Sequence, residues 1–358
     1  MERPLYFALF ACCVPVRGAA RSTLCDLQRR RHYLVPNSLV GALEMASDRP
    51  WDDVCAAAHP DDVAVLNEYV AFLEAQDLGF FTEEPERFPP LSLRWQRPEP
   101  IANAIIDVDG RSDHDFNALA RQLDELRCKT LQLRFFDPIG VDGLRAAISP
   151  FDHGRLRAIE VLAPHSPELT EDEFASVLIE FQRVGRAYLH GAPEDAVLPL
   201  PESAAQRIVL RRDRVTSATC CGQVHPQYFV TSLEVFTESL EYNTCLNRKV
   251  SVDAHGEIKN CPTMARSFGN AAEVPLAAAV AQPGFKDVWG VTKDQVEVCR
   301  DCEFRRICTD CRAVLSDPSN PLSKPATCTY DPYTATWTSP EPAHVGSGRE
   351  SDSLAVHA

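Results

Sequence analysis

The sequence predicts an α/β protein in three parts: a small module of helices and strands, a run of βα units, and a cysteine-rich C-terminal part. Three observations support this. Strand-like and helix-like segments alternate at a spacing of about thirty residues through the middle third. Three segments with helical apolar spacing precede them. Nine of the fourteen cysteines fall between Cys220 and Cys328. The length of 358 residues suits two or three domains.

The N-terminal module is predicted over residues 1–85. Residues 5–35 alternate apolar and polar side chains around turn sequences, which predicts short strands. Three helices follow, because apolar residues recur at helical spacing, and residues 78–83 form a final strand. This order of elements is typical of a winged-helix-like module.

The apolar run at residues 5–16 resembles the core of a signal peptide. Glu2 offsets Arg3, so the basic leading segment is missing, and Pro15 and Arg17 interrupt the run. A buried first strand explains the run better, and we expect a cytoplasmic protein. No apolar run is long enough to span a bilayer, so no membrane partner is expected. The net charge of −15 argues against wholesale nucleic-acid binding.

Proline and charge predict a linker at residues 86–100. Alternating strands and helices then predict a parallel sheet with helices on its faces over residues 101–218. Right-handed crossovers would make it an open sheet or a partial barrel. The cysteine-rich part is predicted over 219–337, and the polar residues 338–358 form a predicted disordered tail.

Four cysteines between Cys299 and Cys311 follow the pattern C-x2-C-x5-C-x2-C. Without an export signal, this spacing predicts metal ligands rather than disulfides. Upstream, a predicted hairpin with a turn at Gly256 brings Cys245 and Cys261 together at its open end. Spacing alone fits either a zinc ion with four thiolates or a 4Fe–4S cluster. The remaining cysteines are predicted to be small buried hydrophobes: Cys12, Cys13, Cys25, Cys55 and Cys128.

The segments "CCGQVHPQYF", "NTCLNRKVSVDAHGEIKNCPTM", "CRDCEFRRICTDCRA" and "CTYDPYTATW" resemble the SPASM-domain peptide maturases of the grasp-with-spasm systems. The N-terminal "LFACCVPVRGAARSTLCDLQRRRHYLVPN" is similar to the start of that family. The middle of the chain shares only the βα pattern. The family usually has three residues between the fifth and sixth of its seven cysteines, whereas "CTDC" has two, which puts ligation by Cys311 in question.

The resemblance implies two auxiliary 4Fe–4S clusters. The ligands of the first would be Cys299, Cys302, Cys308 and Cys328. The second would use Cys245, Cys261 and Cys311, which leaves one position open. A cubane cluster is usually held by four thiolates, so Cys220 or Cys221 is the candidate for it.

Radical S-adenosylmethionine enzymes, to which SPASM domains are attached, carry a CxxxCxxC loop after the first barrel strand. The corresponding loop here, "GRSDHDF", has no cysteine. The barrel is therefore predicted to be of a degenerate radical-SAM type, with no bound S-adenosylmethionine and no radical cleavage of it. Five other polar residues in and before the loop offer divalent-metal ligands, although helix capping is the favoured role: Asp107, Asp109, Asp113, His114 and Asp115.

The resemblance further implies maturation of a ribosomally synthesised, post-translationally modified peptide, with a precursor peptide and an ATP-grasp ligase as partners. The N-terminal module would recognise the precursor by strand addition. The basic run Arg29, Arg30, Arg31 and His32 would attract acidic leader residues, unless it is a solvated turn. Two alternatives stay open: a redox or cluster-dependent peptide-modifying enzyme, and a zinc-binding scaffold of the same shape.

Overall fold

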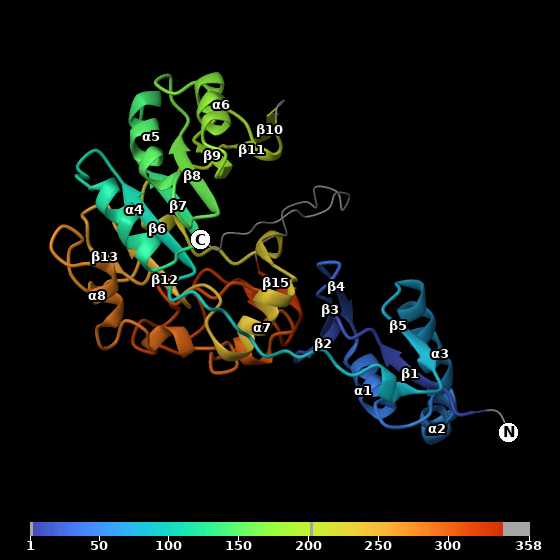
Figure 1. The fold of residues 1–358 in the computed structure, drawn as a ribbon. Helices are drawn as coiled ribbons and strands as arrows, with labels where there is room; N and C mark the ends of the chain where they lie inside the picture. The colour runs from blue at the N-terminus through green and yellow to red at the C-terminus, as the bar shows by residue number, and fades with distance from the viewer. Residues whose placement is uncertain (1–2, 201–202, 339–358) are drawn as a thin grey trace.

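The computed structural model describes residues 3–200 and 203–338 (Figure 1). The predicted tail therefore lies outside the described residues, apart from Thr338. Within the described ranges, no helix combines the length and the apolar character that a bilayer crossing requires.

The N-terminal module contains two antiparallel sheets and three helices. Its first sheet pairs β1 (Tyr6–Leu9) with β5 (Gly79–Thr82). The second sheet has the order β2 (Cys13–Arg17), β3 (Ser22–Asp26), β4 (Arg31–Val35). The helices are α1 (Asn37–Ala46), α2 (Trp51–Ala57) and α3 (Pro60–Ala75). These elements lie where the apolar periodicity predicts them, and Pro60 takes the first helical position, where its missing N–H costs nothing.

The central strand of the sheet β2–β3–β4 is covered on both faces, since every residue of β3 is buried. Leu24 packs on one face against the module's helices. Cys25 packs on the other face against Phe304 and Tyr330 of the cysteine-rich part. Beside this contact, Arg21 Nε donates to the fully buried carboxylate of Glu303 at 2.7 Å. The sheet is therefore a layer that the N-terminal module shares with the cysteine-rich part.

The large central sheet has eight strands in the order β10-β11-β9-β8-β7-β6-β12-β13. Its bounds are β6 (Asn103–Val108), β7 (Thr130–Phe135), β8 (Ala158–Pro164), β9 (Val184–His190), β10 (Ala196–Leu200), β11 (Ser203–Arg211), β12 (Lys249–Val252) and β13 (Ile258–Lys259). All neighbours pair in parallel except the two edge pairs, β10–β11 and β12–β13. This confirms a mixed α/β fold with a large, mostly parallel sheet, consistent with a partial barrel.

Successive side chains of a strand point to opposite faces of a sheet. In this sheet the two faces differ in chemistry. One face presents apolar side chains such as Leu133 and Val161 to the core under α4 (Phe116–Glu125), α5 (Val141–Ile148) and α6 (Glu171–Glu180). The opposite face carries buried polar groups. Arg134 on β7 donates to both carboxylate oxygens of Asp107 on β6, at 2.6 and 2.8 Å. The polar face of the sheet therefore contains a buried ion pair between Arg134 and Asp107.

The cysteine-rich part contains little regular structure besides the hairpin that joins the central sheet. Apart from short 3-10 helices, its other described elements are α7 (Leu233–Glu241), α8 (Leu276–Ala281), β14 (Tyr330–Asp331) and β15 (Thr336–Trp337). The predicted linker is held against this part, since the Trp95 ring lies 5.1 Å from that of Tyr242. The predicted linker thus packs against the cysteine-rich part instead of forming a free spacer.

Candidate metal centres

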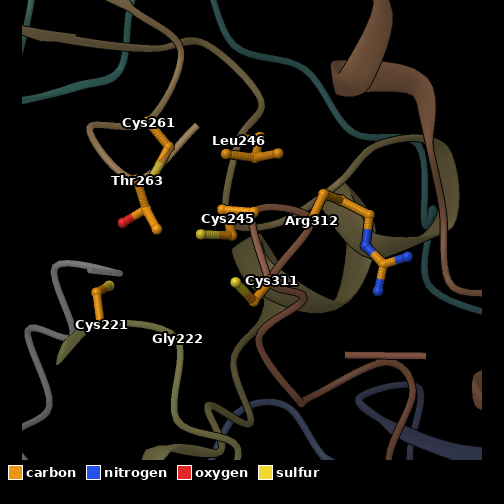
Figure 2. Close-up of a pocket in the computed structure, with 9 residues that line it drawn as sticks. Cys221, Gly222, Cys245, Leu246, Cys261, Thr263, Cys311 and Arg312 are labelled. Atoms are coloured by element: carbon orange, nitrogen blue, oxygen red, sulfur yellow. The ribbon is translucent and has the colours of Figure 1, made fainter. Parts of the chain in front are cut away.

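Four cysteine side chains from distant segments point into one pocket (Figure 2). The pocket holds about 280 Å³ of space, including its opening to solvent. We call this group the barrel-side tetrad: Cys221, Cys245, Cys261 and Cys311. The adjacent Cys220 is exposed and does not line the pocket. Of the two adjacent cysteines, Cys221 therefore lines the pocket with the other three, and Cys220 does not.

Local structure explains how the hairpin positions two members of the barrel-side tetrad. β12 and β13 pair antiparallel around a turn in which Gly256 has φ +84°, a conformation that favours glycine. Cys245 lies before β12 and Cys261 after β13. The side chain of Asn243 accepts from the backbone N–H of Cys245 at 3.0 Å and fixes the entry into the hairpin.

Gly222 brings the other two members together. It adopts φ +87°, and a Cβ there would lie 2.8 Å from the sulfur of Cys311. A side chain at this position would be strained and would also push Cys311 away. Glycine is therefore required for Cys221 and Cys311 to face the same pocket.

Cationic side chains from the central sheet lie beside the barrel-side tetrad. Lys249 on β12 is completely buried, and its Nζ lies 3.5 Å from the sulfur of Cys245. The charges of Cys221 and Cys261 also act on Arg134. A buried ammonium group is costly without a nearby anion, and a metal-bound thiolate group provides one. The residues around this pocket thus suit a metal–thiolate group that carries net negative charge.

Burial opposes free thiolates at the same position. It raises the pKa of Cys245 to about 12, with the positive charge of Lys249 acting in the opposite direction. The other three cysteines of the tetrad raise this pKa further, because they place negative charge nearby. Burial and the nearby negative charges therefore both oppose a free thiolate at Cys245.

A second group lies under the shared sheet, and we call it the sheet-side tetrad: Cys299, Cys302, Cys308 and Cys328. Burial raises the pKa of Cys299 to about 12, and the charges of Cys308 and Cys328 contribute to the increase. Cys302, Cys308 and Cys328 pack around the apolar cluster that contains Phe304. The four predicted ligands of the first cluster are therefore neighbours.

The C-x2-C segment of the sheet-side tetrad forms a tight turn. The backbone N–H of Cys302 donates to Cys299 O at 3.0 Å, and that of Phe304 donates to Cys302 Sγ at 3.4 Å. The next turn is closed by the N–H of Cys308, which donates to Phe304 O at 2.9 Å. Backbone N–H groups directed at sulfur favour its charged form, as expected at a metal-binding turn.

The segment from Cys308 to Cys311 connects the two tetrads and is held by buried polar groups. Lys293 Nζ donates to Cys308 O at 2.5 Å and to Thr309 O at 2.9 Å. Asp310 pairs with Arg312 at 2.7 Å. The short connection therefore has a fixed path between the two tetrads.

Other predicted site residues lie elsewhere. Arg29, Arg30 and Arg31 are exposed at the turn between β3 and β4, and Arg29 binds the carboxylates of Asp26 and Asp77. His32 is half-buried against the rings of Phe229 and Phe304, with its Nδ1 3.2 Å from Thr231 Oγ1. The basic run is thus divided between an exposed turn and the shared layer.

The polar loop after β6 is held by its own hydrogen bonds. Asp115 caps α4 by accepting from Ala118 N at 2.9 Å, and Asp109 accepts from Arg111 N at 2.8 Å. His114 Nε2 bonds to Asp107 O at 2.8 Å. These contacts agree with the structural roles that the sequence favoured for this loop.

Sequence reasoning did not identify Lys249, Lys293, Arg134 or Gly222 as site residues. The signal for Lys249 was a charge within the apolar alternation of "RKVSVD". The burial of Lys249 in the central sheet could not be inferred, because β12 joins β6 across a long sequence separation.

Glu160 on β8 also belongs to the polar face, and its ionisation gives a testable pH dependence. Burial raises its pKa to about 7, whereas the hydrogen bond from Gln132 and the charges of Arg186 and Arg134 oppose the increase. The ordinary value is 4.5, so the native state keeps a proton that the unfolded chain loses. This group's contribution to stability therefore decreases as the pH rises from about 4.5 to 7.

We expect Glu160→Gln to leave the free energy of unfolding nearly unchanged at pH 5 and to raise it by about 2 kcal/mol at pH 8. The new amide can also donate to Gln132 Oε1, which has no hydrogen-bond partner among the described residues. Urea unfolding at both pH values measures the effect. A gain that is equal at the two pH values would contradict the assignment of a raised pKa.

Together, the fold and the two tetrads define an α/β protein with a cysteine-rich C-terminal part in which cysteines from distant segments lie close together. No family model matches the chain, and no curated protein matches it. Solved structures of SuiB from Streptococcus suis are similar to it. SuiB bound to S-adenosylmethionine has a TM-score of 0.41 at 8% identity, over 91% of this chain and 98% of that one. SuiB bound to its precursor peptide SuiA has a TM-score of 0.28 at 10% identity, over 92% and 99%. At these values the similarities define neither a family nor an activity for this chain.

Proposed function

We propose that this chain is a maturation protein for a ribosomally synthesised, modified peptide. It holds two 4Fe–4S clusters and presents the precursor peptide to an ATP-grasp ligase. The observation that carries the proposal is the barrel-side tetrad, in which four sulfurs face one pocket beside the buried Lys249. The family resemblance of the cysteine segments and of the N-terminal start supplies the peptide-maturation role.

The two tetrads fit cubane clusters. Each offers four thiol groups, the number that a saturated cluster takes. Cys299, Cys302, Cys308 and Cys328 hold the first cluster, and Cys221, Cys245, Cys261 and Cys311 hold the second. Such clusters supply one-electron transfer and a cross-link between distant segments. Lys249 balances the negative charge of the second cluster, and Lys293 fixes the carbonyl groups next to Cys308.

The spacing of the sulfurs favours clusters over zinc. A tetrahedral zinc ion with Zn–S bonds of about 2.3 Å holds its sulfurs about 3.8 Å apart. Among the described residues, no three sulfurs of either tetrad lie within 4.8 Å of one another. A cubane, with iron at four separate corners, suits a wider arrangement. The zinc scaffold of the same shape is therefore the less favoured alternative.

The N-terminal module is winged-helix-like and receives the precursor at β4. Among the described residues, β3 is the one strand that pairs with β4, so the other edge of β4 can accept an added strand. Leu34 on β4 is 46% exposed, and Val65 on the nearby helix α3 is 39% exposed. Tyr33 of β4 contacts Phe72 of α3, which places these two elements side by side. A peptide strand added here would find apolar contacts from both.

Binding of the precursor to the cluster-loaded chain tests this role. The peptides to titrate are the short ones encoded beside its gene. We expect Leu34→Asp and Val65→Asp to weaken binding at least tenfold, since each buries a charge against the peptide. Met45→Asp is the matched control, because Met45 is 45% exposed on α1. Equal affinities in all three variants would reject β4 as the docking edge.

The presenting role has its own test. We expect the ATP-grasp ligase to modify the precursor faster when this chain is present. An unchanged rate would count against presentation. Modification of the precursor by this chain alone, dependent on a reductant, would favour the enzyme alternative, which the buried polar face beside the barrel-side tetrad also allows.

A further inference from the structure

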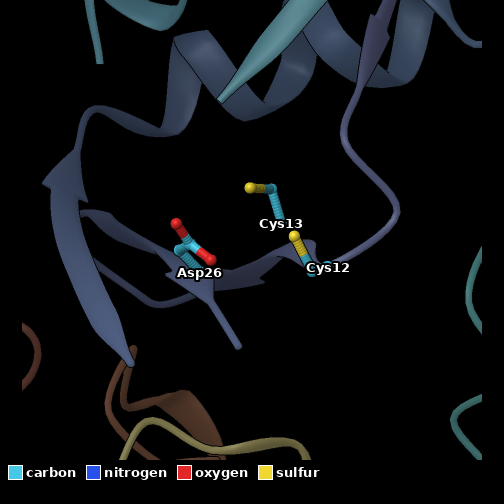
Figure 3. Close-up of side chains that lie close together, drawn as sticks. All are labelled: Cys12, Cys13 and Asp26. Atoms are coloured by element: carbon cyan, nitrogen blue, oxygen red, sulfur yellow. The ribbon is translucent and has the colours of Figure 1, made fainter. Parts of the chain in front are cut away.

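A third group of metal-ligating side chains lies in the N-terminal module, away from both tetrads. The sulfurs of Cys12 and Cys13 and a carboxylate oxygen of Asp26 all lie within 4.8 Å of one another (Figure 3). Cys13 is 4% exposed and Asp26 is completely buried, while Cys12 is partly buried. Two sulfurs and one carboxylate oxygen therefore share one half-enclosed position.

The local backbone explains why two adjacent cysteines point to one side. Successive residues within a strand face opposite ways. Cys12, however, belongs to the turn before β2, which is closed by Cys13 N donating to Phe10 O at 2.7 Å. Cys13 is the first residue of β2 and stands opposite Asp26 in the β2–β3 register. The turn and the strand pairing together assemble the three ligand atoms.

The carboxylate of Asp26 is oriented by hydrogen bonds and still has capacity for a metal. One oxygen accepts from the backbone N–H groups of Gln28, at 3.2 Å, and Arg29, at 2.9 Å. The other accepts from the Arg29 guanidinium at 3.1 Å. An ionised carboxylate has about four lone-pair sites, so one remains. Arg29 also binds Asp77, so its charge has a second partner. Bonds of this kind orient a ligand in the way outer-shell groups do at metal sites.

The chemistry of the three ligand atoms favours a dication such as zinc. Two thiolates and a carboxylate are ligands that zinc prefers, with bonds of about 2.0 to 2.3 Å. Ligand atoms around one such ion lie about 3.5 to 3.8 Å apart, which the observed spacing accommodates with a small adjustment.

We propose that Cys12, Cys13 and Asp26 bind one zinc ion in the N-terminal module, with a fourth position open to water. The ion ties the start of β2 to the end of β3 and so stabilises the shared sheet. This site is independent of the proposed iron–sulfur clusters, because its ligands belong to neither tetrad.

Zinc content of the full chain, loaded anaerobically with iron and sulfide and then dialysed against zinc, tests the proposal. We expect one zinc per chain in the wild type and none in Cys12→Ser/Cys13→Ser. Cys55→Ser is the matched control, since Cys55 is a partly buried cysteine of the same module outside the group, and it should keep the zinc. Equal zinc in all three proteins would overturn the proposal.

X-ray absorption at the zinc edge of the wild-type protein gives a second readout that does not depend on a variant's folding. A first shell of two sulfurs with lighter atoms is expected. A shell of four sulfurs would place the zinc in a tetrad and would overturn the proposal. Asp26→Asn, which keeps the shape of the side chain, should weaken zinc binding at least tenfold relative to Cys55→Ser; unchanged affinity would remove Asp26 from the site.

Discussion

Cys302→Ser is expected to lower the iron content of anaerobically reconstituted protein from about eight to about four atoms per chain, because each cubane contains four irons. Cys245→Ser should cause a loss of the same size by removing the other cluster. The double variant should retain almost no iron. Iron and acid-labile sulfide, measured together with the visible absorbance, quantify the effect.

Cys128→Ser is the matched control for this series. Cys128 is completely buried but lies in the main core, where its thiol donates to Thr130 O, a bond that serine can keep. It should retain about eight irons. If Cys302→Ser and Cys245→Ser also retained full iron, the two tetrads would not hold clusters. If either single variant lost all iron, the clusters would not be separate.

Lys249→Met is expected to lower the reduction potential of the cluster in the barrel-side tetrad by on the order of 100 mV. A unit charge about 6 Å away contributes roughly 3 kcal/mol at an effective dielectric constant of about 20. Its removal disfavours the reduced cluster, which carries one more negative charge. Methionine keeps the bulk of the buried side chain, so the effect on packing should be small.

Redox titration followed by electron paramagnetic resonance measures this shift. Lys259→Met is the matched control. Lys259 lies on the same hairpin, but its charge already pairs with Asp253 at 2.8 Å, and its removal should shift the potential much less. An intact cluster with an unchanged potential in Lys249→Met would show that the buried ammonium does not act on the cluster.

Local patterns were sufficient to predict most helices and strands. The apolar periodicity of residues 116–125 and 171–180, with Asp115 and Thr170 as caps, specifies helices without help from distant residues. The alternation of these helices with β-rich segments then implies the parallel sheet. The prediction for the central part was correct because short-range signals and the final packing agree there.

Long-range pairings could not be predicted in the same way. The hairpin β12–β13 was expected only as a support for cysteines, yet β12 extends the central sheet by pairing with β6. The contact depends on residues far apart in the sequence, and nothing in "RKVSVD" specifies the partner. The antiparallel strand β10, at the opposite edge of the sheet, was also missed, because it is a short edge strand without clear alternation.

The choice between Cys220 and Cys221 also required the fold. The two cysteines are adjacent in the sequence, but the turn at Gly222 directs Cys221 toward Cys311 and leaves Cys220 exposed. A similar limit applied to the basic run. Its composition predicted either attraction to acidic peptides or a solvated turn, and its position divides it: the arginines are exposed at a turn, and His32 packs against Phe304 in the shared layer.

This position connects the proposed peptide site to the sheet-side tetrad. β4 offers its open edge to a peptide, and His32 of the same strand contacts Phe304, whose backbone N–H donates to the sulfur of Cys302. The proposed docking strand is therefore only one side chain away from a proposed cluster ligand.

The central claim is that the converging sulfurs of the C-terminal part hold two iron–sulfur cubanes. Anaerobic purification, with iron, sulfide and zinc quantified on the same sample, tests it most directly. The account predicts about eight irons and eight sulfides per chain, with zinc no higher than the one equivalent assigned to the N-terminal module. Two or more zinc ions per chain with no acid-labile sulfide would contradict it.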